Sequence, residues 1–137
     1  MRYIVVVLLF CQLLFARELV VVGNSNFPKQ TLSLQEVQSI FLSKKRFIDG
    51  KRVLVMNFEV NSSLRRCFEK HILKKSQASL ERYWRKAYYQ GKRPPKIVTS
   101  KEMLFLYLQT VQPSIGYVDA NATSNREVKV LYRVGCD

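Results

Sequence analysis

Short apolar segments of strand length alternate with segments of helical periodicity through residues 18–134, and this alternation limits the folds open to the chain. Brief apolar runs are typical of strands, whereas apolar side chains that recur every three or four residues are typical of helices. Strands that alternate with helices predict an α/β domain, a layered and mostly parallel sheet flanked by helices. The predicted strands are residues 18–23, 53–58, 97–99, 115–118 and 128–134. Two of the predicted helices begin at capping boxes, formed by Ser33 with Glu36 and by Thr99 with Glu102, and two others begin at Leu64 and at Ala78.

The helix predicted from Ala78 to Gln90 is rich in aromatic residues. Helical spacing places Tyr83, Trp84 and Tyr88 on its core side, which favours a core role over a stacking platform, whereas Tyr89 points elsewhere. Gly91 ends this helix, and a loop with two prolines follows. In that loop Lys92 and Arg93 either line the mouth of a pocket or are solvated.

The N-terminus has the features of a secretory signal peptide. Arg2 precedes an apolar run over residues 4–15, and Ala16 offers a small residue for cleavage. The run is shorter than the roughly 20 residues of a membrane-spanning helix, which favours a cleaved signal over the alternative, an uncleaved anchor. Phe10 is too bulky for a lipoprotein cleavage site before Cys11, so no lipid anchor is expected. We therefore expect a signal peptide over residues 1–16, one domain over residues 17–137, and a periplasmic location.

Positive charge is concentrated in the middle of the chain. The whole sequence has a formal net charge of +13, and residues 44–101 contain 17 Lys and Arg against 4 Asp and Glu. Such a field attracts anions, acidic proteins or anionic surfaces, although it is also typical of a basic exported protein whose charge aids solubility. No recognised nucleic-acid motif accompanies it, so a nucleic-acid partner is not expected.

The chain offers few residues for catalysis or metal binding. His71 is the only histidine, and the acidic residues are scattered, so neither a metal cluster nor a catalytic triad is expected. This pattern indicates a non-enzyme without a cofactor. Cys67 and Cys136 remain after removal of the signal peptide, and in an oxidising compartment they form either a disulfide or two free thiols.

The junction between the strand 53–58 and the next helix suits an anion. Ser62, Ser63 and Arg65 lie where the strand leads into the helix. The first amides of a helix lack internal partners, and the helix dipole adds positive charge there. The guanidinium of Arg65, one turn into the helix, can reach back to an oxyanion. The alternative is that Ser62 only caps the helix and Arg65 is solvated.

Several stretches resemble one known family, in the same order along the chain. Residues 33–45 are similar to a family stretch that ends in Ile-Phe-Leu-Gly-Lys, and residues 49–53 are similar to the family's Asp-Gly turn into a strand. Residues 62–68 are similar to Ser-Gly-Thr-Arg-x-x-Phe, and residues 113–118 are similar to Pro-Gly-Ala-Ile-Gly-Tyr-Val. Residues 83–84 and 91–95 look like the signature of a short subfamily. The chain is thereby similar to the type 2 periplasmic solute-binding proteins, as a short member of the phosphate-binding type.

This resemblance implies one lobe, or a reduced form, of a fold that normally closes two lobes on a ligand. It implies phosphate or a similar oxyanion bound at Ser62, Ser63 and Arg65, with polar contacts from Asn24 and Ser25 in the first loop. Ser63 stands where the family usually has glycine. Leu64 stands where the family has a threonine hydroxyl, which removes one group from the expected site.

We therefore expect an exported module that binds phosphate for uptake or sensing, with a membrane transporter or sensor as a partner. The alternative function is a periplasmic accessory that contacts an envelope sensor or transporter and has no small ligand. Asn61 and Asn121 lie in sequons with an acidic residue two positions earlier, so they are either glycan acceptors or ordinary turn residues.

Overall fold

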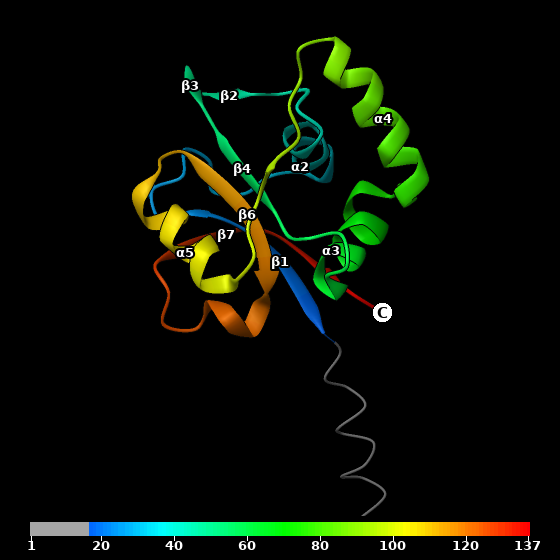
Figure 1. Ribbon diagram of the computed structural model, residues 1–137. Helices are drawn as coiled ribbons and strands as arrows, with labels where there is room; N and C mark the ends of the chain where they lie inside the picture. Colours follow the sequence, from blue (N-terminus) through cyan, green and yellow to red (C-terminus); the bar gives the residue numbers. More distant parts are fainter. Residues whose placement is uncertain (1–16) are drawn as a thin grey trace, which may run out of the picture.

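The computed structural model describes residues 17–137, and its centre is a five-stranded sheet (Figure 1). The strands lie in the order β5-β4-β6-β1-β7. Neighbouring β5, β4 and β6 are parallel, and β1 is antiparallel to both β6 and β7. Four strands therefore run in one direction, which confirms the mostly parallel α/β fold. The strands are β1 (Glu18–Asn24), β4 (Leu54–Asn57), β5 (Lys96–Ile97), β6 (Ser114–Asp119) and β7 (Val128–Gly135).

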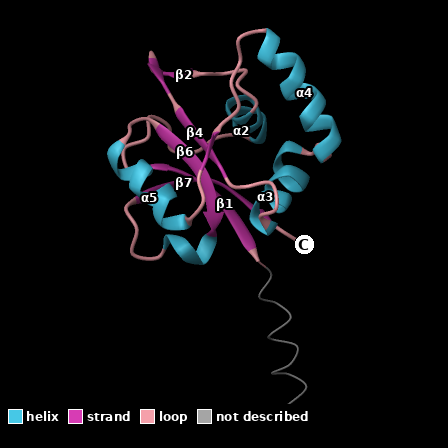
Figure 2. Cartoon of the chain, viewed as in Figure 1, coloured by secondary structure: helices cyan, strands magenta, loops and turns pink. Residues whose placement is uncertain are grey.

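Helices cover both faces of the sheet (Figure 2). Gly116 of β6 faces Leu104 of the helix α5, whereas the neighbouring Tyr117 packs on Phe68 of α3 and Phe41 of α2. Because successive strand residues point to opposite faces, α5 lies on one side of the sheet and α2 and α3 on the other. The helices are α2 (Leu34–Phe41), α3 (Ser63–Phe68), α4 (Gln77–Tyr89) and α5 (Lys101–Thr110).

The core is centred on β1 and β6. Residues 19–22 of β1 are fully buried, as expected for a strand covered on both faces. Tyr117 of β6 stacks on Phe68, with ring centroids 4.1 Å apart, and also contacts Phe58 edge-on. Tyr88 is 60% exposed, so its expected place in the core was wrong. The helix α4 buries only Leu80 and Ala87, a narrower face than its aromatic residues had indicated.

A small hairpin precedes β4. The strands β2 (Phe47–Ile48) and β3 (Lys51–Arg52) pair antiparallel across a turn in which Asp49 and Gly50 both have positive φ. Two positive φ values are typical of a tight hairpin turn, and Gly50 adopts its value without strain. The strand expected at 53–58 is present as β4, one residue shorter at each end, and Val53 separates it from the hairpin strand β3.

Local helix geometry also departs from the sequence pattern. The helix expected from Leu64 to about Lys75 consists of α3 followed by the π-helix η1 (Glu69–Leu73), which ends at Lys74 in the left-handed conformation. The capping box at Ser33 and Glu36 is present, but Ser100, not Thr99, caps α5. A 3-10 helix, η2 (Ala120–Thr123), follows β6.

The expected signal peptide, residues 1–16, lies outside the described residues. Within residues 17–137, none of the helices has both the length and the apolar character needed to cross a membrane.

Candidate functional site

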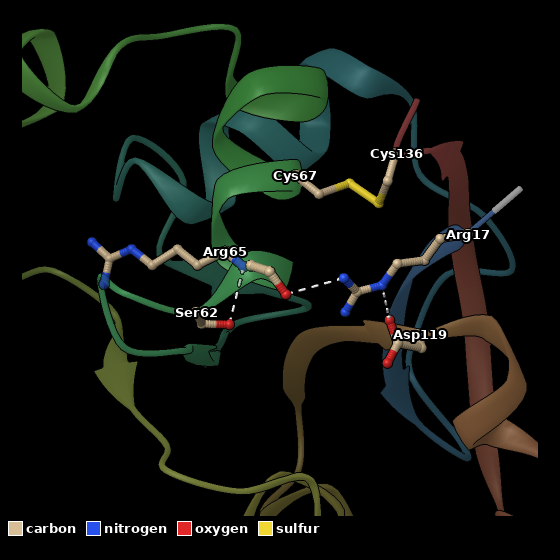
Figure 3. The surroundings of a disulfide bond; sticks show 7 residues. Arg17, Ser62, Arg65, Cys67, Asp119 and Cys136 are labelled. Atoms are coloured by element: carbon tan, nitrogen blue, oxygen red, sulfur yellow. Dashed lines mark hydrogen bonds and ion pairs between the residues drawn. A yellow bond between two sulfur atoms is a disulfide. The ribbon is translucent and has the colours of Figure 1, made fainter.

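The carboxyl ends of β4 and β6 lie beside the first turns of α3 and α5. Asp119, the last residue of β6, accepts hydrogen bonds from Arg17 Nε at 2.8 Å and from Lys101 Nζ at 2.6 Å. Arg17 also donates through Nη1 to the Ser63 hydroxyl at 3.1 Å (Figure 3). Lys101 thus joins the start of α5 to the end of β6, and Arg17, which precedes β1, joins the end of β6 to the start of α3. The arrangement places two cations and two helix N-termini at one edge of the sheet.

The carboxyl group of Asp119 is held in its ionised form. Burial raises the pKa of this carboxyl, but hydrogen bonds and charge from Arg17 and Lys101 outweigh burial and keep the pKa below its usual value. Two cations around one carboxylate leave an excess of positive charge at this edge. An oxyanion that approached the two cations would therefore compete with Asp119 for them.

Ser62 caps α3. Its Oγ accepts from the Arg65 amide at 3.3 Å, and its carbonyl oxygen accepts from the Arg66 amide at 3.1 Å. This bears out the capping alternative for Ser62. The amides of Ser63 and Leu64 come before the first internal bonds of the helix, so the helix itself offers them no partner. They are the groups of α3 that can face an anion.

Arg65 is held within the fold. Its Nε donates to Glu69 at 3.0 Å, and its Nη1 donates to the carbonyl oxygen of Phe58 at 2.8 Å. The side chain is only 16% exposed. In Figure 3 it points away from Arg17 and Asp119. The solvated alternative for Arg65 is therefore incorrect, and its guanidinium does not reach back over the start of α3.

Asn24 and Ser25 lie at the other end of the sheet, so the five expected anion-binding residues do not form one site. Because β1 runs opposite to β4 and β6, its last residue lies beside the first residue of β6, Ser114. Asn24 is buried; its Oδ1 accepts from the Ser114 amide at 3.0 Å, and its Nδ2 donates to Asn26 at 2.7 Å. Asn24 is thus a structural residue, and Ser25 is exposed next to it.

A buried hydrogen-bond network supports the loop before α3. The Tyr117 hydroxyl donates to Asn57 Oδ1, which also accepts from the Phe58 amide at 2.9 Å. Burial raises the pKa of Tyr117, so the hydroxyl stays protonated and serves as a donor. Since the Phe58 carbonyl in turn accepts from Arg65, the network connects the core to α3. The sequence gives no signal for it, because Asn57 and Tyr117 come from different strands.

A cavity of about 310 Å³ lies along one side of α3. Its cationic lining comes from Arg17, Arg66 and Lys70, and the Ser63 side chain also contributes. Arg65 instead lines a separate cavity of about 490 Å³ together with Trp84 and Tyr88. Ser63 and Arg65 thus belong to different sides of α3, and the cations nearest Ser63 include Arg17, which the sequence did not single out.

Cys67 and Cys136 form a disulfide in the structure (Figure 3). The bond joins α3 to the residue that follows β7, across a sequence separation of 69 residues. It borders the cavity beside Ser63 and therefore fixes one wall of that cavity.

The remaining expectations concern single side chains. Asn61 and Asn121 are both exposed, in the loop before α3 and in η2, and their glycosylation stays a prediction. His71 is half-buried in η1, and its Nε2 has no hydrogen-bond partner among the described residues. Residues 17–137 contain no group of three or more His, Cys, Asp or Glu side chains that would hold a metal ion.

Structural comparison identifies the fold. The chain superimposes on a putative phosphate ABC transporter substrate-binding protein with bound phosphate from Clostridium perfringens, with a TM-score of 0.68 and 16% identity over 85% of this chain and 45% of the other. An ABC-type phosphate transport receptor from Vibrio cholerae gives a TM-score of 0.66 and 15% identity, with 85% of this chain and 46% of that chain covered. PstS from Borrelia burgdorferi gives a TM-score of 0.65 and 12% identity, with 85% of this chain and 47% of that chain covered. The chain has their fold.

The resemblance expected from the sequence is therefore confirmed at the level of the fold. The chain spans less than half the length of these neighbours, as expected for one lobe or a reduced form. No protein-family model matches the sequence, and a search of curated proteins finds no match.

Proposed function

We propose that the protein binds phosphate or a related oxyanion at the start of α3. The observation that carries this proposal is the contact of Arg17 with the Ser63 hydroxyl at 3.1 Å, at a helix start, in a fold shared with phosphate-binding proteins. A helix N-terminus with an adjacent guanidinium combines amide donors, the helix dipole and a full charge.

The binding groups differ from those that the family pattern implies. The amides of Ser63 and Leu64 and the Ser63 hydroxyl supply neutral donors, and Arg17 supplies the charge. Ser62 positions these amides by capping the helix, and Arg65 holds α3 against the loop at Phe58. Leu64 is buried and has no hydroxyl to offer. The site is therefore half of a phosphate site that binds the anion weakly on its own, and we propose that a second copy or a partner protein supplies further donors.

We further propose that the protein acts in the periplasm in phosphate uptake or sensing, with a membrane transporter or sensor as its partner. Cleavage near Ala16 would release the described domain with Arg17 at its N-terminus. A disulfide is stable in that compartment, where oxidising conditions hold. N-terminal sequencing and intact mass of the exported protein test cleavage and report any glycan at Asn61 or Asn121.

Calorimetric titration with phosphate tests the binding site. The protein purified from the periplasm should bind phosphate saturably, and Arg17→Gln/Ser63→Ala should weaken binding by at least about tenfold, since it removes a charged donor and a hydroxyl. A control variant, Arg133→Gln/Ser124→Ala, makes the same chemical changes at two exposed positions. An absence of saturable binding in the wild type, or an equal loss in the control, would overturn the proposal.

A further inference from the structure

A third cavity, of about 310 Å³, lies at the opposite end of β4 from α3. One wall is the β2–β3 hairpin with the loop before it, and the other is the segment between α4 and β5; both lie in the upper part of Figure 1. Five cationic side chains line the cavity, and no acidic side chain does. The cationic residues are Lys45, Arg46, Arg52, Arg93 and Lys96.

Hydrogen bonds fix the two walls relative to each other. The Ser43 hydroxyl donates to the carbonyl oxygen of Arg93 at 2.7 Å, which joins the loop after α2 to the segment before β5. The Val53 amide donates to the carbonyl oxygen of Arg46 at 3.0 Å, which closes the base of the hairpin. Pro94 and Pro95 restrict the opposite wall further. The cavity is thus formed by constrained backbone rather than by mobile loops.

The positive charge of this cavity is not balanced within the fold. None of the five cations forms an ion pair with another residue in the range 17–137, although the Arg93 guanidinium lies over the Tyr88 ring at 5.8 Å and Lys96 Nζ lies over the Tyr107 ring at 5.3 Å. Ile40 and Val53 add apolar surface to the lining, and the five like charges repel one another and attract an anion. A bound polyanion would relieve this repulsion.

We propose that this cavity binds a soluble compound with two or more phosphoryl groups, of the chemical class of inorganic pyrophosphate. Cations line both walls, so a ligand with two charged groups can contact both, whereas one phosphate group satisfies fewer of them. The volume lies at the lower end of the range for small-molecule pockets, which suits a compact ligand. Arg46 and Arg52 on the hairpin wall each carry a planar guanidinium that matches phosphoryl oxygens, and Arg93, whose guanidinium lies over the Tyr88 ring, carries a third. This site is separate from the start of α3.

Calorimetric titration of the protein with pyrophosphate tests the second site. The variant Arg52→Gln/Arg93→Gln removes one cation from each wall. The matched control, Arg82→Gln/Lys86→Gln, removes two exposed cations of α4 that do not line this cavity. We expect at least about tenfold weaker binding for the cavity variant and little change for the control. Binding should weaken with added salt.

The α3 variant separates this proposal from the phosphate site. Pyrophosphate binding that survives Arg17→Gln/Ser63→Ala but not Arg52→Gln/Arg93→Gln supports the second site, whether or not phosphate binds at α3. An equal loss of pyrophosphate affinity in the cavity variant and in its control would mean that net charge alone accounts for binding, and it would overturn the proposal. Binding to phosphatidylglycerol vesicles without binding of pyrophosphate would also overturn it, because the ligand would then be a membrane surface.

Discussion

Phe68 and Tyr117 stack in parallel, with ring centroids 4.1 Å apart and ring planes within 3°. Phe68 ends α3, and Tyr117 lies in the central strand β6, so the stack attaches the helix of the candidate phosphate site to the sheet. The hydroxyl of the same tyrosine donates to Asn57, at the end of β4. One side chain therefore positions both the helix and the strand that precedes it.

Truncation of Phe68 should destabilise the protein strongly. Phe68 is fully buried, and Phe68→Ala leaves a cavity against Tyr117, so the free energy of unfolding should fall by about 3–5 kcal/mol. Urea denaturation measures the change. Leu106→Ala is the control, since Leu106 is 59% exposed and its truncation should change stability by less than about 0.5 kcal/mol. A similar small effect for Phe68→Ala would contradict the packing described here.

Gly116 should not tolerate a side chain. A Cβ at this position would lie 2.4 Å from Leu104 Cδ1, and Leu104 is fully buried and cannot easily move aside. Gly116→Ala should therefore cost about 1–3 kcal/mol through overpacking. Gly135→Ala provides the control, because no atom lies within 4 Å of its added Cβ. Thermal melts of both variants check the difference, and equal midpoints would refute the close contact between β6 and α5.

Reduction of the disulfide should lower stability. The Cys67–Cys136 bond closes a loop of 69 residues, and in the chain-entropy model its loss costs about 4 kcal/mol. Wild-type protein should melt at a clearly lower temperature in reductant, at about the midpoint of Cys67→Ala/Cys136→Ala. The double variant itself should not respond to reductant. A wild-type melting temperature that is the same with and without reductant would argue against this bond.

Asn24 should matter for stability and not for anion binding. Asn24→Ala leaves the buried Ser114 amide without its acceptor, which should cost about 1–3 kcal/mol in urea denaturation. Phosphate affinity, measured at a temperature where the variant is folded, should equal that of the wild type because Asn24 lies at the far end of the sheet. A marked loss of phosphate affinity without a loss of stability would return Asn24 to the binding site.

The contribution of Asp119 to stability should depend on pH. Its pKa in the folded state is lowered by Arg17 and Lys101, whereas in the unfolded chain it is about 3.9. Its stabilising effect is therefore complete above the unfolded value and is lost as pH falls through the lower folded value. Asp119→Asn should destabilise the protein at pH 7, and the difference from the wild type should shrink as the pH falls below about 3.9, as measured by urea denaturation. A pH-independent difference would mean that charge is not its source.

The sequence predicts most elements correctly because local signals specify them. The side chains of Ser33 and Ser62 cap helices as such residues commonly do, and the apolar run of β1 is buried on both faces. Periodicity was less reliable for Tyr88, because α4 lies against the rest of the molecule by a narrow face only. How wide a face a helix buries is decided by tertiary packing and not by its own sequence.

The candidate site was harder to predict because it depends on strand direction and on distant partners. Nothing in residues 18–24 shows that β1 runs opposite to its neighbours, and this reversal moves Asn24 away from Ser62. Arg17 and Asp119 are separated by 102 residues, so no local pattern relates them. Arg65 matches the family motif, but the motif does not reveal that Glu69 and the Phe58 carbonyl occupy its guanidinium.

The position of β1 also determines when the sheet can assemble. Leu19 pairs with Asp119 on one side and with Val134 on the other, so both neighbours of the first strand come from the last part of the chain. Such high contact order makes folding slow and postpones it until nearly all of the chain is available. During synthesis, the tertiary structure would therefore form only after residues 114–135 have left the ribosome, and the earlier part of the chain would wait without its partner strands.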